Sequence, residues 1–508
     1  MELKNSSVIP VGQKLFLAMM GFVAFSIILF ATNSYGAGLS PDSVNYISVA
    51  RSIVNGAGFV QFSGSPMVVW PPLYPMILAT VEHIFGVDPL SSAAFINAIL
   101  FGLIVYLSGL LALKYLPAFP SFAMLGTLAI VFSIPLFEVS TMTWSEPLFI
   151  CFVLLSFVFA CSYLETNRLL TLVLFSLSVA LSTLVRYIGV TVILWGVLTI
   201  LISHRGSLKN KTGHFLLFIL LSTLPLSLWL IRNYIISNTL FGSRSLSTYT
   251  VFENLSLMFT QLFYWYIPHK VIEDPSILVI ATLGIGLFAI LSLRAGMKMN
   301  LGRASSLILF TIIYLVFVII SSTTTAYDPI NNRLLAPIFV PLTLLLLISV
   351  QAIVSPHRKR FSKKLVDFLL LIGLMIGLLY PVYITTANAK MMNSIGQGYS
   401  GKVWRESETV QYLLHHQALE SECTLYTNGP DIVYILMDII AKPIPNKTRS
   451  HVSDLSNSWP EESDVCLVWF NKIERTYLFT VDELQAIANI DLITHLEDGA
   501  IYSIARKQ

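Results

Sequence analysis

Apolar runs of about 20 residues recur along most of this 508-residue chain, and they constrain its fold more than any other feature. A helix of that length rises about 1.5 Å per residue and so matches the thickness of a bilayer. Hydrophobic residues make up 55% of the chain and charged residues only 12%. The sequence therefore predicts a polytopic α-helical membrane protein.

We expect about eleven spans, each an apolar window of about 20 residues. A polar start without a convincing small-residue cleavage site favours an uncleaved first span over a removed signal peptide. The two short runs on either side of Arg186 are either two spans or one kinked element. The predicted spans cover residues 15–32, 89–113, 121–139, 146–164, 169–185, 187–202, 215–235, 276–293, 305–321, 334–354 and 365–385.

The distribution of lysine and arginine predicts the orientation of the spans. With the N-terminus in the cytoplasm, most of these residues fall in inner segments, including the cluster at 358–364, as the positive-inside rule requires. An odd number of spans places the C-terminal tail outside, and we expect the plasma (inner) membrane. The few basic residues of the outer segments are Arg51, Arg186, Arg232, Arg244, Lys270 and Arg333.

A change in composition near residue 388 indicates a second domain. We predict a transmembrane domain at 1–387 and a small extracytoplasmic α/β domain at 388–508. Within the polar tail, strand-like and helical runs alternate. The strand-like runs are 423–426, 465–470 and 501–504, and the helical runs are 407–415 and 481–488.

The four cysteines fall into two pairs. Cys151 and Cys161 lie ten residues apart in one span, which is about 15 Å of helix rise and beyond the reach of a disulfide. Cys423 and Cys466 each fall in a strand-like run of the tail. A disulfide between them is compatible with an extracytoplasmic tail, but the sequence leaves the pairing open.

Most of the outer charges lie at the ends of spans and not in hydrophilic linkers. Arg186 and Arg333 each open a span, Arg232 closes one, and Glu146 opens another. Ionisable side chains at that depth are costly unless they face a cavity, a partner or a ligand, so these residues are candidate site residues. The alternatives are that Arg232 and Arg333 are interfacial anchors and that Arg186 forms a structural pair with Glu146.

A surface helix is predicted to begin directly after the first span. Ser40 is a good N-cap, Pro41 suits the first helical position, and Asp42 falls in the first turn, where the helix dipole favours a carboxylate. Tyr46 follows on the same face four residues later. One side of this helix thus carries a carboxylate and a phenol, unless Asp42 only stabilises the start of the helix.

Several short segments, in this order and spacing, resemble the C-type membrane glycosyltransferases, in particular relatives of protein O-mannosyltransferases and of the aminoarabinose transferase that modifies lipid A. The resemblance covers residues 10–385 and a family-like extracytoplasmic tail. No single segment is specific for the family, whereas their order and spacing are. The segments are Asp42-Ser43-Val44-Asn45-Tyr46, Trp70-Pro71-Pro72-Leu73-Tyr74, Ser145-Glu146-Pro147-Leu148, Arg186-Tyr187, Ile231-Arg232-Asn233-Tyr234, Phe241-Gly242-Ser243-Arg244 and Arg333-Leu334-Leu335-Ala336-Pro337.

The resemblance implies an inverting transfer of a sugar from a polyprenyl-phosphate carrier to a lipid, glycan or protein acceptor at the outer membrane face. It implies that Asp42 is the catalytic acid of the first outer loop. The acceptor needs a base to take its proton, and the carrier phosphate needs positive charge. We expect Arg232, Arg244 and Arg333 to bind the phosphate, with Tyr46, Glu146 and Arg186 as further substrate-binding residues.

Two departures from the family pattern affect these expectations. Many relatives have a second acid directly after the first, where this chain has Ser43, which weakens a metal-binding role for the loop. Some relatives have a lysine before the double proline, where this chain has Trp70. No residue is assigned as a metal ligand and no cofactor is predicted with certainty, although Glu146 can help to hold a divalent cation.

The main alternative function is that of a transporter or flippase of a lipid-linked or small anionic substrate. Transporters usually place ionisable groups near the midplane and show related halves. Here the charges concentrate at one face and no internal repeat is evident, so the sequence favours the enzyme. A membrane scaffold that displays the tail would leave the outer arginines unexplained, and nothing in the sequence indicates a nucleic-acid partner.

Overall fold

The computed structural model describes residues 9–117, 119–202, 208–268, 301–326, 328–354, 362–416, 423–447, 455 and 459–507. The chain divides into two compact units. The first, called here the helical unit, comprises Met1–Asn33, Val68–Ile77 and Ser91–Asn393. The second, the sheet unit, comprises Ser34–Met67, Leu78–Leu90 and Ser394–Gln508, so the first loop and the tail fold together.

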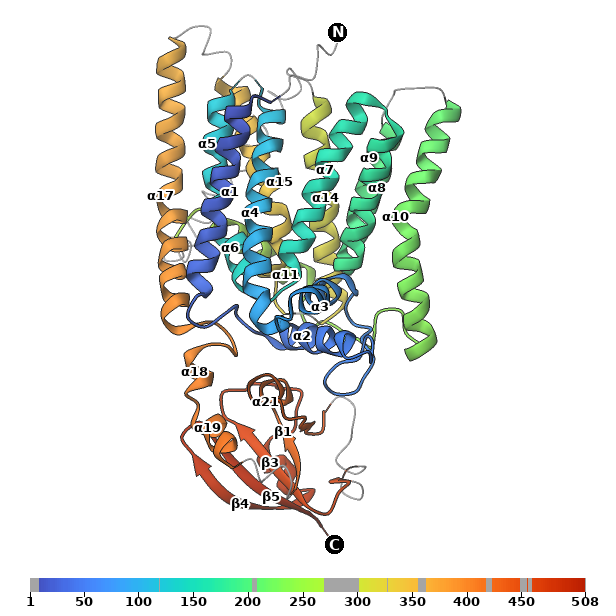
Figure 1. Ribbon diagram of the computed structural model, residues 1–508, viewed down its shortest axis with the longest axis vertical. Coiled ribbons are helices and arrows are strands. Elements are labelled where there is room, and N and C mark those ends of the chain that lie inside the picture. The colour runs from blue at the N-terminus through green and yellow to red at the C-terminus, as the bar shows by residue number, and fades with distance from the viewer. Residues whose placement is uncertain are drawn as a thin grey trace. The chain divides into compact units, whose positions relative to one another are not determined.

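Long apolar helices running side by side form the helical unit (Figure 1). Among the described residues, seven helices are long and apolar enough to cross a membrane, or eight if one bent pair counts as a single span. The chain is therefore an integral membrane protein. The helices of this unit are α1 (Val11–Thr32), α4 (Pro89–Tyr115), α5 (Pro120–Val131), α6 (Ile134–Thr141), α7 (Glu146–Thr166), α8 (Leu169–Val185), α9 (Val190–Ile202), α10 (Leu208–Ser237), α11 (Val251–Tyr264), α14 (Leu301–Thr324), α15 (Asn332–Val354) and α17 (Lys363–Ile395).

Each predicted span that falls in the described residues coincides with a helix or a helix pair, and the run 276–293 lies outside them. One prediction was wrong in detail, because 121–139 is not a continuous helix. It consists of α5 and α6, bent by 47° at a break where the Ser133 hydroxyl caps α6 by accepting from the Leu136 amide at 3.3 Å. The open question at Arg186 is also answered: α8 and α9 are separate helices of 17 and 13 residues, joined through an extended Arg186 and a short 3₁₀ turn.

Small residues allow the first helices to approach closely. A Cβ added to Gly21 of α1 would lie 2.8 Å from the carbonyl oxygen of Gly102 on α4. A Cβ added to Gly102 would lie equally close to the carbonyl oxygen of Gly21. Such contacts are the usual basis of helix association in a bilayer, where burial of apolar surface gives little driving force. These two glycines therefore fix the spacing of α1 and α4.

A five-stranded sheet forms the centre of the sheet unit, with the strand order β2-β1-β3-β5-β4. The first three strands in that order are parallel and the remaining pairs are antiparallel. The predicted strands and the helix at 407–415 are confirmed, whereas α21 and β4 were missed and the helix predicted at 481–488 ends at Gln485. The elements are α18 (Lys402–Arg405), α19 (Glu408–His415), β1 (Thr424–Thr427), α21 (Pro430–Met437), β2 (Lys442–Pro443), β3 (Val465–Phe470), α23 (Val481–Gln485), β4 (Ala488–Leu496) and β5 (Gly499–Arg506).

The cysteines pair as the sequence allowed. Cys423, directly before β1, forms a disulfide with Cys466 on the neighbouring β3, which closes a loop of 43 positions. Cys151 and Cys161 are free thiols, as predicted from their spacing. The disulfide therefore links two adjacent parallel strands of the sheet.

The first loop packs against the tail within the sheet unit. Its helices are α2 (Pro41–Val54) and α3 (Leu73–Phe85), and α3 spans the boundary between the units. Leu39 forms a parallel bridge with Gly398, and Val44 and Ile47 of α2 share a buried apolar cluster with Tyr434 and Ile435 of α21. Helix α2 is thus held by residues from the far end of the chain.

A bidentate ion pair strengthens this contact. The Arg51 guanidinium donates to both carboxylate oxygens of Asp88, at 2.8 and 3.1 Å, and to the Tyr434 hydroxyl at 3.4 Å. Burial lowers the pKa of Arg51, but the hydrogen bonds to Asp88 and Tyr434 outweigh it and raise the pKa above its ordinary value. Arg51 therefore stays charged at any pH at which the protein is folded.

Candidate active site

Glu146 is the centre of a charged cluster in the helical unit. It is the first residue of α7 and its side chain is completely buried. Its Oε1 atom accepts a hydrogen bond from Nε of Arg333 at 2.5 Å and forms an ion pair with Nη1 of Arg186. The start of α7, the end of α8 and the start of α15 therefore meet at one carboxylate.

The two arginines have further contacts that fix their orientation. Arg186 donates to the Ser145 hydroxyl at 3.2 Å, and the Arg333 guanidinium lies 4.4 Å from the centroid of the Trp144 ring. Their side chains remain 19% and 13% exposed, whereas that of Glu146 has no exposure. Both arginines are therefore partly accessible to a ligand, and the fully buried Glu146 contacts both of them.

The Glu146 carboxylate and the two guanidiniums form one largely buried charged group. Arg186 and Arg333 contact the same carboxylate oxygen, Oε1. The second oxygen of Glu146, Oε2, is buried and accepts no hydrogen bond from the described residues. Because a buried polar atom without a partner is costly, the cluster favours an anion carrying a hydroxyl group or a bound water.

A second polar cluster adjoins the first, because Tyr187 follows Arg186 directly. The Tyr187 hydroxyl accepts from Trp229 and Asn233, each at 3.1 Å, and donates to the Val68 carbonyl at 2.9 Å. This arrangement joins α10 to the segment at 68–77 of the same unit. Tyr187 and Asn233 therefore hold the end of α10 against this segment, close to two further arginines.

Arg232 and Arg244 are those two arginines. The guanidinium of Arg232 lies 4.5 Å from the centroid of the Trp229 ring and donates to the Asn233 side chain at 3.0 Å. Arg244 donates to the Val69 carbonyl at 3.2 Å and is otherwise exposed. Both arginines are attached to the same framework around residues 68 and 69, so the structure brings them together.

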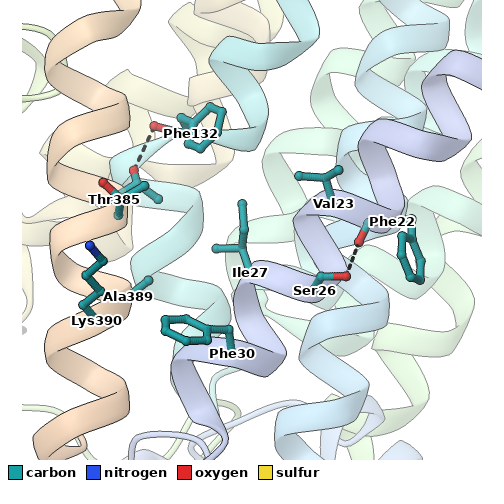
Figure 2. Close-up of a pocket in the computed structure, with 10 residues that line it drawn as sticks. Phe22, Val23, Ser26, Ile27, Phe30, Phe132, Thr385, Ala389 and Lys390 are labelled. Carbon is teal, nitrogen blue, oxygen red and sulfur yellow. Dashed lines mark hydrogen bonds between the residues drawn. The ribbon is translucent and has the colours of Figure 1, made fainter.

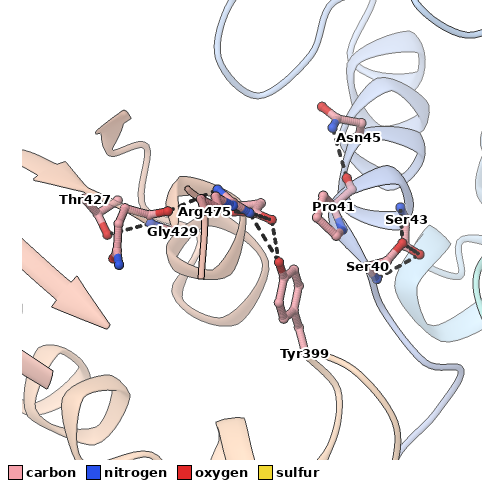
Figure 3. Close-up of polar contacts among 10 residues, drawn as sticks. Ser40, Pro41, Ser43, Asn45, Tyr399, Thr427, Gly429 and Arg475 are labelled. Carbon is pink, nitrogen blue, oxygen red and sulfur yellow. Dashed lines mark hydrogen bonds and ion pairs between the residues drawn. The ribbon is translucent and has the colours of Figure 1, made fainter. Parts of the chain in front are cut away.

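Asp42 and Tyr46 belong to the sheet unit, not to the unit that contains the arginines. As predicted, Ser40 caps α2, and the hydroxyls of Ser40 and Ser43 and the two backbone amides form a reciprocal capping box (Figure 3). Asp42 lies in the first turn and is partly exposed, whereas Tyr46 is only 2% exposed. Tyr46 is therefore a packing residue of α2, and Asp42 is its accessible acid.

The same close-up shows a polar network within the tail (Figure 3). Arg475 donates to both carboxylate oxygens of Asp431 at 2.8 Å, and the Tyr399 hydroxyl donates to the same carboxylate at 2.8 Å (Figure 3). Asp431 lies in the first turn of α21, the helix that packs on α2. Sequence patterns did not reveal this network, because its members come from three segments of the tail.

Glu138 and Asn332 are site residues that the sequence did not single out. The Asn332 amide, next to Arg333, donates to Glu138 at 2.8 Å and accepts from Trp265 at 2.8 Å. These contacts fix the start of α15 and hence the position of Arg333. The only signal in the sequence was the polar run before Arg333.

Glu146, which the sequence offered as a possible ligand of a divalent cation, contacts two guanidiniums in the structure. Within the part of the chain that the structure describes, no group of three or more acidic, histidine or cysteine side chains is placed to hold a metal ion. Ser43, at the position of the second acid in relatives, is fully buried and its hydroxyl is used by the helix cap.

Comparisons with known proteins agree on the architecture. No protein-family model and no curated protein matches the sequence. Among solved structures, ArnT from Cupriavidus metallidurans in the apo state superposes with a TM-score of 0.61 at 13% identity, covering 96% of this chain and 97% of that chain. The same protein bound to undecaprenyl phosphate gives 0.60 with the same identity and coverage. This chain has the fold of the C-type membrane glycosyltransferases.

A second solved structure supports the same conclusion. The oligosaccharyltransferase from Archaeoglobus fulgidus, in complex with zinc and sulfate, gives a TM-score of 0.57 at 13% identity. The match covers 96% of this chain and 73% of that chain. Both the helical unit and the tail therefore belong to the shared fold, as the resemblance in the sequence predicted.

Proposed function

We propose that this protein is an inverting glycosyltransferase that moves a sugar from a polyprenyl-phosphate carrier to a lipid, glycan or protein acceptor at the outer membrane face. The observation that carries the proposal is the pair of arginines, Arg186 and Arg333, that meet around Glu146 at the ends of three helices. The match to ArnT along nearly the whole length of both chains supports it, because that protein binds undecaprenyl phosphate.

The arginines supply what a phosphate leaving group needs. A guanidinium has five donors in a planar fork, which suits Arg186 and Arg333 to binding phosphate oxygens. Arg232 and Arg244 add charge from the adjoining framework. As the bond between the sugar and the phosphate breaks, these groups stabilise the negative charge that develops on the phosphate.

We assign the role of base to Asp42. The acceptor hydroxyl or amine gives its proton to the Asp42 carboxylate while the acceptor atom attacks the anomeric carbon from the face opposite the phosphate. The bond from the anomeric carbon to the phosphate oxygen breaks, polyprenyl phosphate leaves, and the configuration inverts. The partial exposure of Asp42 in the first turn of α2 supports this role, because an acceptor can reach its carboxylate.

The proposal includes an orientation in the plasma (inner) membrane, with the N-terminus inside and the tail outside. The disulfide between Cys423 and Cys466 supports it, because such bonds persist in oxidising compartments. The ion pair of Lys114 with Glu165 lies at the other ends of α4 and α7 from Glu146, as expected if basic residues collect on the inner side. The fold supports the enzyme and gives no support to the transporter alternative.

The decisive experiment measures transfer by the purified protein in lipid nanodiscs. Polyprenyl-phosphate-linked hexoses and pentoses are supplied as donors, and the release of polyprenyl phosphate is followed with wild type, Asp42→Asn and Asp491→Asn. General-base catalysis contributes about 10²- to 10⁴-fold, so we expect Asp42→Asn to lose at least 100-fold in kcat. Asp491, an exposed residue of β4, undergoes the same change of charge and should leave kcat unaltered.

Two results would contradict the proposal at different points. Unchanged turnover in Asp42→Asn would remove Asp42 from the mechanism and leave the glycosyltransferase assignment intact. Absence of release with any donor, together with movement of a labelled carrier lipid between leaflets, would replace the enzyme with the transporter. A chelator tests the divalent cation separately, and a loss of activity restored by added Mg²⁺ or Mn²⁺ would show that a divalent cation takes part in the reaction.

A further inference from the structure

An apolar groove runs between the first and last helices of the helical unit. It has a volume of about 340 Å³ and is lined by α1 and α17, with Phe132, from the break between α5 and α6, at its back (Figure 2). Phe22 and Phe30 of α1 are 66% and 48% exposed along its edge. The lining residues are Phe22, Val23, Ser26, Ile27, Phe30, Phe132, Thr385, Thr386, Ala389 and Lys390.

The hydroxyl groups of the groove already donate to the protein itself. Ser26 donates to the Phe22 carbonyl at 2.9 Å, and Thr385 donates across the groove to the Phe132 carbonyl at 3.0 Å. Thr386 donates to the Val382 carbonyl of its own helix at 2.7 Å. These hydroxyls therefore have no donor left for a ligand, so the body of the groove suits a hydrocarbon chain.

Lys390 differs from every other residue of the groove because it carries a charge. It is exposed, it projects from α17 five positions before that helix ends, and no described residue forms an ion pair with it. A lysine near the end of a membrane helix extends its ammonium towards the lipid headgroups. The groove thus combines a hydrocarbon-binding surface with one cation at the depth of the headgroups.

We propose that this groove binds an anionic phospholipid, with one acyl chain along α1 and α17 and the headgroup phosphate paired with Lys390. Charge complementarity selects the headgroup, because Lys390 is the single donor that the lining leaves for it. The site is separate from the proposed carrier site: Arg232 lies on α10, which stands at the opposite side of the helical unit from α17 (Figure 1). The proposal does not depend on the catalytic function.

The test titrates the purified protein with two lipids and counts the bound lipids by native mass spectrometry. Phosphatidylglycerol and phosphatidylcholine with identical acyl chains are compared on wild type, Lys390→Gln and Lys364→Gln. Lys364 is an exposed lysine at the other end of the same helix and serves as the matched control. An ion pair near the membrane surface is worth about 1 kcal/mol, so we expect about fivefold tighter binding of phosphatidylglycerol. That preference should disappear in Lys390→Gln only.

A second pair of variants tests the acyl-chain position. Thr386→Trp fills the groove and should remove one bound lipid, whereas Tyr383→Trp, at a 69% exposed position outside the groove, should retain it. Equal affinity for the two lipids in wild type, or a preference that survives in Lys390→Gln, would overturn the proposal. So would tighter retention of polyprenyl phosphate that Thr386→Trp abolishes, which would make the groove a carrier site. A dimer that only Thr386→Trp dissociates would assign the groove to a second copy of the chain.

Discussion

Glu146 shows how much a single buried side chain can determine. The sequence suggested a pairing of Glu146 with Arg186, because both residues stand at the ends of neighbouring spans. It did not indicate Arg333 as a third member, since that contact joins residues 187 positions apart and depends on how α15 packs against α7. The sequence showed the charge of each site residue and its position along a span, but it did not show which of these residues contact one another.

Removal of the Glu146 charge tests this cluster. In Glu146→Gln two arginines lose their counter-charge in a buried setting, and breaking a buried pair costs about 3–5 kcal/mol. We expect a large fall in the temperature of thermal unfolding and loss of donor binding. Glu165→Gln is the matched control on the same helix, because its partner Lys114 lies in an ion pair whose side chains are 25% and 30% exposed.

The control should change the stability by less than about 1 kcal/mol, as exposed pairs do. Equal effects of the two substitutions on thermal unfolding would show that the Glu146 cluster has no special role in the fold.

Arg333 tests the binding of phosphate at the same scale. Arg333→Lys keeps the charge but replaces a planar fork of donors with a single ammonium, so bidentate contact is lost. We expect KM for the lipid-linked donor to rise about tenfold or more, with Lys402→Arg, an exposed residue of the sheet unit, as a neutral control. An unchanged KM would mean that Arg333 acts only as the partner of Glu146.

At the scale of elements, the first loop gave the most reliable sequence signals. The N-cap at Ser40, the proline at the first position and the acid in the first turn predicted the start of α2 correctly, because each acts on its own backbone. The sequence could not predict that α21 packs on this helix, because apolar contacts are not directional and their pattern does not specify which segment covers them. The sequence also did not predict the bend between α5 and α6. Mean hydropathy identifies a stretch that can cross a membrane, but it does not show whether that stretch is one continuous helix.

Arg51 provides the test of how α2 is held. Arg51→Ala removes the bidentate contact to Asp88 and the contact to Tyr434, so α2 should open more often. We expect faster hydrogen exchange across Pro41–Val54 and unchanged exchange in β3, measured by mass spectrometry on the intact protein. Arg405→Ala is the control, because the guanidinium of Arg405 contacts Tyr35 of the same unit. Unaltered exchange in α2 of Arg51→Ala would contradict the role assigned to Arg51.

For the whole molecule, hydropathy and charge predicted the class of fold because both are averages over many residues. The tail was recognised as α/β from alternating runs, yet its strand order and the disulfide required the structure. The candidate site was predicted less fully than the class of fold and more fully than the strand order. Its candidate residues were chosen as charges at span ends, and their grouping into two clusters emerged only from packing.

The orientation of the molecule can be measured in intact cells with a membrane-impermeant maleimide. A cysteine placed at Asp491, exposed on β4, should be labelled, and one placed at Lys364, at the start of α17, should be protected until the membrane is permeabilised. Cys151 is buried and Cys423 and Cys466 are joined, so the labelling uses a Cys161→Ser background to remove the half-buried free thiol. The reverse pattern of labelling would invert the proposed topology.

The contact between α2 and α21 has a consequence for biosynthesis. Arg51 and Tyr434 are 383 positions apart, so at 5–20 residues per second a ribosome makes the second roughly 20 to 80 s after the first. During that interval α2 lacks its partners on α21. The helix that carries Asp42 can therefore reach its final packing only after α21 has been synthesised.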